Sequence, residues 1–546
     1  MLPRLFCVRL DSIFDPGEDG APGAGRRART ALSEIVIGEG PVGLELIAAA
    51  ACGRIGVRLS GAASFRERLE RSRRALDSAL ERGEPVYGVS TGFGRACGRR
   101  VDPAEAAALG AELVRFHCCG LGEPLAMDEV RAAVLCRLIG LAQGYSGVRH
   151  ELLQAFVDLL SSDVVPLIPS QGSVGASGDL TPLSYLVACM AGEREAFFAG
   201  QRMPAAEALR RAGLSPFAFA PKEALAIVNG TSVMTGIAAL AAVRASHVLD
   251  AAVCGTALAV HALSGHARHF CAGLVDAKPH PGSRRVAAAL RALLASHGPV
   301  PESDSPEHLQ DPYSCRCAPQ VLGVLSDALG WIRPWLEREA NSANDNPLVD
   351  PDTGEVWTGG NFYGGHVAFA ADCLKAALAT AAGLCERQVA LLVDARFSRG
   401  LPADLVRDAS HGLMHGFKAV QITATALAAE LARAAMPAAV FSRSTESHNQ
   451  DTVSLGTISA RDAIRAVRGC ARVVAVQLAA AAQAAELRGG IEGRPALEAA
   501  LERVRALSPK VDADRALDAE LERLAGACEE GDLFAGLDAI RPEGVS

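Results

Sequence analysis

Long stretches in the second half of the chain repeat apolar residues, mostly Ala, Leu and Val, at helical spacing. Such spacing gathers apolar side chains on one face of a helix or, where it continues all round, predicts a buried helix. The expected helices, some broken internally, cover residues 222–263, 319–340, 364–393, 406–435 and 453–487, with shorter ones near 496–506 and 513–525. Because the main ones exceed the average length of globular helices, we predict a mainly α fold with a long antiparallel helix bundle.

The pattern is mixed before residue 220. Short apolar runs, an expected helix at 64–82 and glycine-rich loops alternate there, which predicts a smaller mixed N-terminal domain. The expected division is a loose N-terminal extension at 1–35, an N-terminal domain at 36–220, a central helical bundle at 221–490 and C-terminal helices at 491–546.

Composition agrees with packed helices and narrows the class of partner. Of the 546 residues, 49% are hydrophobic but only 5% are aromatic, so small aliphatic side chains must fill the core. The formal charge of −8 is dispersed and leaves no basic patch of the kind that binds nucleic acid. Small molecules or other proteins are therefore the expected partners.

The cysteines and the apolar runs bear on the compartment. Fifteen cysteines, an odd number, are scattered along the chain, which favours reduced thiols in a cytoplasmic protein over a disulfide framework. The first residues carry charges too early and too often for a signal peptide. Apolar runs such as 253–263 are too short or too interrupted to span a membrane, so we expect no membrane association.

Metal binding is not expected from the spacing of possible ligands. The chain contains no HExxH motif. His261, His266 and His269 bring no carboxylate cluster or cysteine pair at a zinc-site spacing.

The stretch GSVGASGDLTPLSYL at 172–186 combines flexible glycines with the triplet Ala176, Ser177 and Gly178. Glycine has no side chain to prevent close approach between backbone atoms. If the amide nitrogen of Gly178 attacks the carbonyl carbon of Ala176, a five-membered ring closes, and loss of water from Ser177 leaves an electrophilic methylidene group. Taken alone, the triplet also fits a turn before a helix that begins at Asp179.

Further polar motifs punctuate the chain. They are YGVSTGFG at 87–94, LVRFHCCG at 113–120, NGT at 229–231, QDPYSCRCAPQ at 310–320, NSANDNPL at 341–348, GGNFYGGH at 359–366 and TESHNQDTVSLG at 445–456. Each alone also fits a structural role, such as a half-buried tyrosine or a loop before a helix. On a helix, the adjacent Phe116 and His117 would diverge by about 100° and not share one face closely. Glu446 and Gln450, four residues apart, could face one site together.

The triplet, the following Asp179–Pro182 segment and the other motifs, in this order, resemble the aromatic amino acid ammonia-lyases and aminomutases, which include histidine, phenylalanine and tyrosine ammonia-lyases. The resemblance runs from about residue 44 to 487. It implies a histidine/phenylalanine ammonia-lyase-like fold and the cofactor 4-methylideneimidazole-5-one (MIO), formed autocatalytically from Ala176-Ser177-Gly178 with no external cofactor. It also implies a homotetramer whose active sites draw loops from three subunits.

The resemblance assigns roles to single residues. Tyr87 matches the catalytic base, which requires surroundings that lower its pKa toward the operating pH. Arg316 matches the residue that holds the substrate carboxylate, and Asn346 assists it. The other matches are Asn229 and Tyr313, which orient the electrophile and its adduct; Phe116 and His117, which meet the substrate ring; Phe362, which lines the pocket; and Gln310, Glu446 and Gln450, which complete the polar wall.

The last motif bears on the substrate. Histidine ammonia-lyases typically have Glu where this chain has Gln450, whereas phenylalanine and tyrosine ammonia-lyases resemble its HNQD form with an upstream Glu, here Glu446. We therefore expect elimination of ammonia from L-tyrosine and/or L-phenylalanine to give 4-coumarate or cinnamate. The alternatives are a histidine ammonia-lyase that gives urocanate, an aromatic 2,3-aminomutase and a catalytically inactive helical scaffold.

Overall fold

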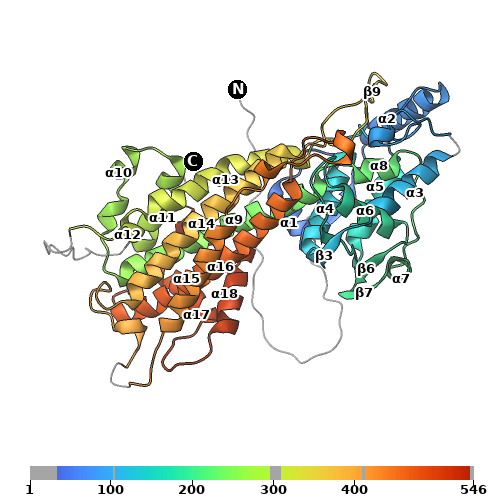
Figure 1. Ribbon diagram of the computed structural model, residues 1–546. Helices are drawn as coiled ribbons and strands as arrows, with labels where there is room; N and C mark the ends of the chain where they lie inside the picture. The colour runs from blue at the N-terminus through green and yellow to red at the C-terminus, as the bar shows by residue number, and fades with distance from the viewer. Residues whose placement is uncertain (1–33, 103–104, 296–308, 409–411, 542–546) are drawn as a thin grey trace.

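The computed structural model describes residues 34–102, 105–295, 309–408 and 412–541. The expected extension at 1–35 lies almost entirely outside the described residues. A bundle of long helices makes up one part of the molecule, and shorter helices with small sheets gather at one end of it (Figure 1).

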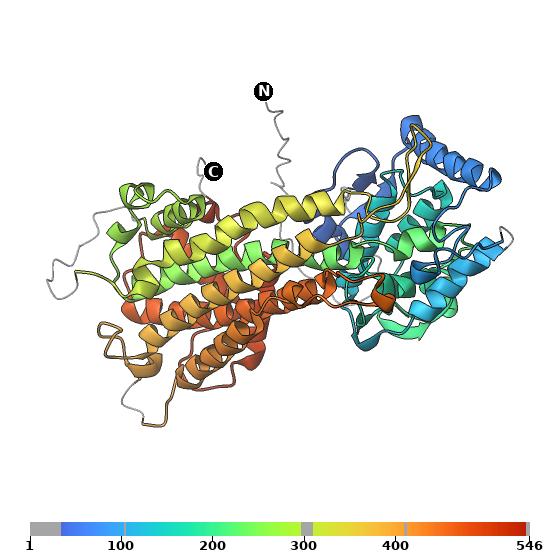
Figure 2. The same ribbon diagram turned by 45° about the horizontal axis from the view of Figure 1, so that its top comes forward.

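Five long helices form the bundle: α9 (Ser232–Ala262), α13 (Ala318–Ala340), α14 (Gly365–Val393), α15 (Lys418–Ala434) and α16 (Gly456–Arg488). Helices α9, α14 and α16 begin close together. Gly364, just before α14, and Gly456, the first residue of α16, both lie against Met234 of α9: a Cβ on either glycine would be within 2.3 Å of the Met234 Sδ. Helices α13 and α15 run the opposite way (Figures 1 and 2). The mainly α bundle predicted from the hydrophobic pattern is therefore confirmed.

Shorter elements occupy the end that carries the N-terminal part. The helices there are α1 (Leu44–Ala51), α2 (Ala63–Glu81), α3 (Ala106–His117), α4 (Met127–Leu141), α5 (His150–Ser161), α6 (Leu180–Met190), α7 (Ala205–Arg211) and α8 (Glu223–Val228). The remaining helices are α10 (Ala272–Asp276), α11 (Pro281–Leu294), α12 (Tyr313–Arg316), α17 (Pro495–Leu507) and α18 (Asp518–Glu530).

The strands are short and form small separate sheets. β1 (Glu34–Ile37) pairs in parallel with β2 (Gly56–Leu59). The antiparallel pairs are β3 (Leu121–Pro124) with β5 (Pro169–Gln171), β4 (Val164–Pro166) with β6 (Glu195–Phe198), β6 with β7 (Gln201–Pro204), and β8 (Leu348–Val349) with β9 (Val356–Trp357).

Two long helices differ from the hydrophobic pattern. The helix expected at 222–263 is interrupted between α8 and α9, where Gly230 has a φ of +150°. The helix expected at 406–435 begins only at Lys418. Gly416 has a φ of +50° and the Phe417 amide bonds back to the Asp404 carbonyl at 2.8 Å, which makes a turn before α15. Local apolar spacing does not detect these backbone reversals.

Helices α9, α14 and α16 are, by length and composition, long and apolar enough to cross a membrane. This corrects the sequence interpretation, because runs such as 253–263 are parts of longer helices. The apolar windows of the three helices are 83%, 67% and 83% buried inside the molecule. Packing within the bundle thus accounts for their hydrophobicity. One cluster of buried side chains extends from Ile35 to Ile540, and the expected domain boundaries stay predictions.

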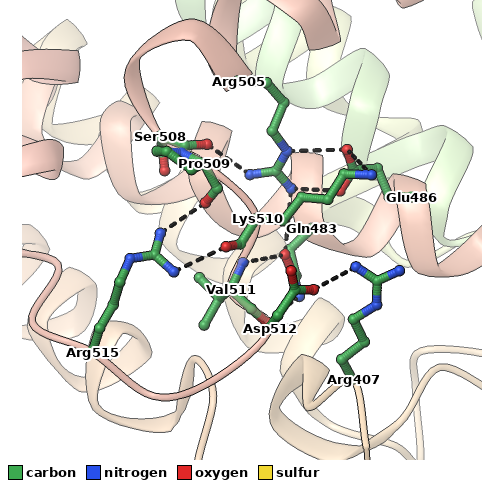
Figure 3. Close-up of polar contacts among 10 residues, drawn as sticks. All are labelled: Arg407, Gln483, Glu486, Arg505, Ser508, Pro509, Lys510, Val511, Asp512 and Arg515. Atoms are coloured by element: carbon green, nitrogen blue, oxygen red, sulfur yellow. Dashed lines mark hydrogen bonds and ion pairs between the residues drawn. The ribbon is translucent and has the colours of Figure 1, made fainter.

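Polar contacts fasten the segment between α17 and α18 to α16 (Figure 3). The side-chain amide of buried Gln483 donates to the Val511 carbonyl at 3.0 Å and accepts from the Val511 amide at 3.1 Å. Arg505 donates to both carboxylate oxygens of Glu486, at 3.2 and 3.0 Å. Because Gln483 satisfies both backbone groups of Val511, this segment packs on the bundle without forming a helix or strand.

Candidate active site

The triplet Ala176, Ser177 and Gly178 lies in the loop before α6. Ala176 belongs to a small buried apolar cluster that includes Val453, from the segment before α16. Gly178 has a φ of +73°, and a Cβ there would lie 2.1 Å from the Gly230 carbonyl oxygen. Only glycine fits this position, so the loop keeps a backbone conformation that other residues rarely adopt.

Backbone pairing with Gly230 leaves the reacting nitrogen of the triplet unengaged. The Gly230 amide donates to the Ser177 carbonyl at 3.2 Å, and the Asp179 amide donates to the Gly230 carbonyl at 2.7 Å. This parallel bridge passes over Gly178, whose own amide has no hydrogen-bond partner within the described part of the chain. The triplet therefore fits the formation of MIO, in which that amide nitrogen bonds to the carbonyl carbon of Ala176.

Asp179 joins the triplet to the start of α9. Its Oδ2 accepts from the amides of Val233 and Met234, both at 2.9 Å, and its Oδ1 accepts from the Thr457 hydroxyl. The carboxylate thus caps the N-terminus of a 31-residue helix. Burial raises the pKa of the Asp179 carboxyl to about 6, although these three hydrogen bonds oppose the rise.

Three helix N-termini meet beside the triplet. The first residues of α9, α14 and α16 surround the Met234 Sδ, and the small residues Gly364 and Gly456 make that approach possible. The Leu455 amide, one residue before α16, donates to the Val174 carbonyl in the triplet's loop at 2.9 Å. Helix N-termini carry partial positive charge, so this point favours a group that gains negative charge.

Asn229 and Asn346 lie in contact with each other. The Asn229 Nδ2 donates to the Asn346 carbonyl at 3.0 Å, and the Asn346 Oδ1 accepts from the Gly359 amide at 2.9 Å. The Asn229 Oδ1 is buried and has no partner among the described residues. Phe362, three residues before α14, is half-buried at the same end of the bundle. These residues thus gather around the start of α9 and α14.

Tyr87 and Glu446 bind the same short turn at residues 94–96. The Tyr87 Oη accepts from the Gly94 amide at 2.9 Å, and the Glu446 carboxylate accepts from the Arg95 amide at 3.0 and 3.1 Å. A Cβ on Gly94 would lie 2.5 Å from that carboxylate. The structure therefore brings two predicted site residues together that lie more than 350 positions apart in the chain.

Glu446 and Gln450 do not lie on a helix, although their spacing is helical, and whether they face one site stays a prediction. Glu446, Ser447 and His448 have φ values of +51°, +53° and +67°, which no α-helix contains. Instead, the Thr445 amide donates to the Gln450 carbonyl at 2.8 Å, and the Thr445 hydroxyl donates to the Gln450 Oε1 at 3.0 Å. Gln450 therefore closes its own turn while Glu446 reaches the Tyr87 loop.

The expectation that Phe116 and His117 cannot share a face closely is wrong. Their ring centroids lie 4.2 Å apart with an interplanar angle of 36°. Both residues are the last of α3, so no following turn separates their side chains. Phe116 is 60% exposed, and the His117 Nδ1 lies 3.0 Å from the Leu113 carbonyl oxygen. The pair forms one aromatic surface at the end of α3.

The pKa of Tyr87 moves in the direction opposite to the one that a base at neutral pH requires. Burial raises this pKa, and the nearby Cys97 and Glu446 raise it further, whereas the hydrogen bond from the Gly94 amide lowers it. Within the described part of this chain, the expected lowering is therefore not found.

Gln310, Tyr313 and Arg316 lie far from the other predicted residues. They flank or form α12, which lies at the opposite end of the bundle from α6 and α8 (Figure 1). Arg316 lies two residues before α13 and Asn346 six residues after it, and the 23 helical residues between them span about 35 Å at 1.5 Å each. The Arg316 guanidinium lies over the Tyr313 ring, and its Nε has no partner among the described residues. One chain alone does not bring Arg316 to the triplet.

The sequence interpretation missed a buried charged network behind the triplet. The Arg137 side chain is fully buried, and its Nη1 donates to the Asn229 carbonyl at 3.0 Å. The Lys222 Nζ lies 2.6 Å from the Asp345 Oδ2, and both side chains are fully buried. The sequence does contain one indication of a buried role for Arg137, because it is the single charged residue in the apolar run VLCRLIGL.

Within the described residues, no group of three or more His, Cys, Asp and Glu side chains is arranged to hold a metal ion. The site thus consists of a strained glycine-rich triplet at three helix N-termini, an amide pair and a tyrosine–glutamate pair. On a bundle of long helices, this combination is that of an ammonia-lyase. Residues 43–506 match the family model described as aromatic amino acid lyase, and the chain belongs to this family.

The family contains similar enzymes with different substrates. A histidine ammonia-lyase of Anaeromyxobacter sp. (strain K) is 41% identical over 499 residues, 90% of this chain and 97% of that protein. A tyrosine ammonia-lyase of Cereibacter sphaeroides is 42% identical over 489 residues, 86% of this chain and 93% of that protein. Histidine ammonia-lyases predominate among the close relatives, which favours the histidine alternative over the expected tyrosine or phenylalanine preference.

Solved structures share the fold. The crystal structure of a histidine ammonia-lyase from Trypanosoma cruzi has a TM-score of 0.86 and 31% identity, covering 94% of this chain and 96% of that one. A tyrosine aminomutase from Streptomyces globisporus also has a TM-score of 0.86, with 35% identity, covering 92% of this chain and 98% of that one. The predicted ammonia-lyase-like fold is therefore confirmed.

Proposed function

We propose that this ammonia-lyase eliminates ammonia from an aromatic L-amino acid by means of MIO formed from Ala176, Ser177 and Gly178. The observation that carries the proposal is the backbone bridge to Gly230, which holds the triplet at three helix N-termini and leaves the Gly178 amide unengaged. When formed, MIO is an electrophile that takes up the amino group of the substrate and makes its nitrogen a better leaving group.

The residues of the chain supply binding and proton transfer. Tyr87 accepts the β-proton of the substrate, and Arg316 holds the substrate carboxylate with its planar fork. Asn229 offers its unpartnered buried Oδ1 to the reacting region, and the helix N-termini stabilise negative charge there. Holding these groups in fixed positions removes much of the entropic cost of bringing them to the substrate.

We further propose a homotetramer with shared active sites. About 35 Å of α13 separates Arg316 from Asn346, so both can reach one carboxylate only if they come from different chains. The exposed Tyr313, at 71%, supports this assignment, because such a side chain can complete a site on a neighbouring chain. A cytoplasmic location remains a proposal based on the reduced cysteines.

His117 supports a substrate whose ring donates a hydrogen bond. Because the Leu113 carbonyl can only accept, the His117 Nδ1 at 3.0 Å from it carries a proton. Burial lowers the pKa of His117, so the ring is neutral and its Nε2 is an acceptor. The imidazole of L-histidine and the phenol of L-tyrosine can both donate to it, whereas the ring of L-phenylalanine cannot. We propose L-histidine, favoured by the close relatives, with L-tyrosine as second candidate because of Gln450.

The specificity constants should reflect this acceptor. We expect kcat/KM for L-histidine or L-tyrosine to exceed that for L-phenylalanine at least about a hundredfold, because L-phenylalanine leaves the acceptor unpaired. His117→Leu should remove this preference, and Phe116→Leu, which keeps the acceptor, should retain it. A wild-type preference for L-phenylalanine would contradict the role of His117 while leaving the lyase activity intact.

Activity should rise with pH because of Tyr87. A base acts in its deprotonated form, so a raised pKa moves the rising limb of kcat/KM to a pH above the ordinary tyrosine value of about 10. Glu446→Gln removes a negative charge that raises this pKa and should move the limb to lower pH. Glu84→Gln, which removes an exposed carboxylate three residues before Tyr87, should leave the limb in place. If Tyr87→Phe retained the limb, another group would be the base.

A further inference from the structure

Arg137 of α4 combines complete burial with incomplete hydrogen bonding. Its Nη1 donates to the Asn229 carbonyl at 3.0 Å, while its Nε and Nη2 have no partner among the described residues. A buried guanidinium is costly to desolvate, and a purely structural one is normally paired on every side. The hydrogen bond that Arg137 makes within the described residues is to the peptide that joins Asn229 to Gly230.

Gly230 in turn forms the backbone hydrogen bonds that hold the triplet. A Cβ on Gly230 would lie 1.8 Å from the Arg137 Nη1 and 2.7 Å from the Asn344 Oδ1, so this backbone is pressed directly against the guanidinium. Gly230 also supplies both hydrogen bonds of the bridge, to the Ser177 carbonyl and from the Asp179 amide. A shift of the Arg137 side chain must therefore move the groups that flank Gly178.

Arg137 lies in a group of buried charges. Asp345 and Asp179 are its nearest counter-charges, and Asp345 is itself held by Lys222 at 2.6 Å and by the Ser146 hydroxyl at 2.9 Å. The two buried cations thus face two buried anions, and one of these anions, Asp179, caps α9 next to the triplet.

We propose that Arg137 is a positioning residue for the formation of the electrophile: its guanidinium fixes the Asn229–Gly230 peptide and so holds the triplet in the geometry that cyclises. This inference rests on the proposed function, because it concerns a reaction that only a triplet of the MIO type undergoes. Arg137 does not touch the reacting atoms and acts through Gly230.

Cyclisation is a redox-neutral loss of two waters. The Gly178 nitrogen bonds to the carbonyl carbon of Ala176, whose oxygen leaves as water with the amide hydrogens of Ser177 and Gly178. The Ser177 hydroxyl then leaves as a second water with the Ser177 α-hydrogen. The first step requires the Gly178 nitrogen to come within bonding distance of the Ala176 carbonyl carbon, and the bridge to Gly230 controls that approach.

The test follows the two waters by intact mass during cell-free synthesis of the full chain. Arg137→Met should slow their loss about a hundredfold, because misplacing reacting groups by about 1 Å costs on that order in rate. Arg137→Lys, which keeps the charge and one donor, should restore part of the rate. The matched control is Arg131→Met on the same helix, because the Arg131 guanidinium also donates to backbone carbonyls, those of Ala51, Leu160 and Ser162, and none of them adjoins the triplet.

The expected result is rapid loss of both waters in the wild type and in Arg131→Met. Arg137→Met should lose them slowly while its helix content shows that it is folded. Equal rates in Arg137→Met, Arg137→Lys and the wild type would contradict the proposed role of Arg137 and would leave the proposed function unaffected. If Arg137→Met does not fold, Arg137→Lys decides by the same comparison of rates. A wild-type chain that keeps both waters would overturn the proposed function, and the role of Arg137 with it.

Discussion

Replacing Ser177 by alanine is expected to lower ammonia-lyase activity at least about a thousandfold, because the electrophile supplies a large share of the rate enhancement of such an enzyme. Alanine has no hydroxyl to eliminate, so the methylidene group cannot form even if the ring closes. The intact mass should then lack one water at most, where the wild type lacks two. The Ser177 side chain is half-buried, so helix content should be unchanged.

Ser173→Ala is the matched control in the same loop. The Ser173 hydroxyl accepts from the Gly175 amide at 3.2 Å and donates to the Thr457 hydroxyl oxygen at 2.9 Å, since the Thr457 hydrogen goes to Asp179, but Ser173 lies outside the triplet. This variant should lose both waters and keep most of its activity. A Ser177→Ala protein with wild-type turnover would mean that the triplet is only a turn before α6.

Mixing two inactive variants is expected to restore activity. Tyr87→Phe and Arg316→Met should each lower activity at least about a hundredfold, through loss of the base and of the carboxylate partner. In an equal mixture of co-refolded chains, about a quarter of the shared sites in a symmetric oligomer combine an intact Tyr87 from one chain with an intact Arg316 from another. Activity should return to about that fraction of the wild-type value.

The control mixture combines two residues from the same end of one chain. Tyr87 and Glu446 bind neighbouring amides of one turn, so they enter the same site together. A mixture of Tyr87→Phe and Glu446→Gln should therefore show no activity beyond that of its Glu446→Gln chains alone. Equal recovery in both mixtures, or none in either, would contradict a site shared between the two ends of different chains.

The fold and the site differ in how far the sequence determines them. Repeated Ala, Leu and Val at helical spacing predicts α9, α14 and α16, because burial of an apolar helix depends mainly on that spacing. The separation of Arg316 from Asn346 also follows from the sequence, since a predicted helix at 319–340 has a known rise per residue. The triplet and its neighbours were found through their resemblance to a family.

Other features depend on contacts between distant segments. The left-handed backbone at Glu446 and Ser447 is stabilised by the reach of Glu446 to Arg95, which helical spacing cannot show. The Phe116 and His117 rings meet because α3 ends there. The role of Arg137 was not predicted because it depends on the contact with Gly230, which lies more than 90 positions later in the chain.

The central claim is tested most directly by incubating the purified protein separately with L-histidine, L-tyrosine and L-phenylalanine and measuring ammonia together with the organic product. The account predicts equimolar ammonia and urocanate from L-histidine, or 4-coumarate from L-tyrosine, with neither formed by Ser177→Ala. A β-amino acid without free ammonia would assign an aminomutase instead. No product from any of the three, from a protein that has lost both waters, would contradict the proposed activity.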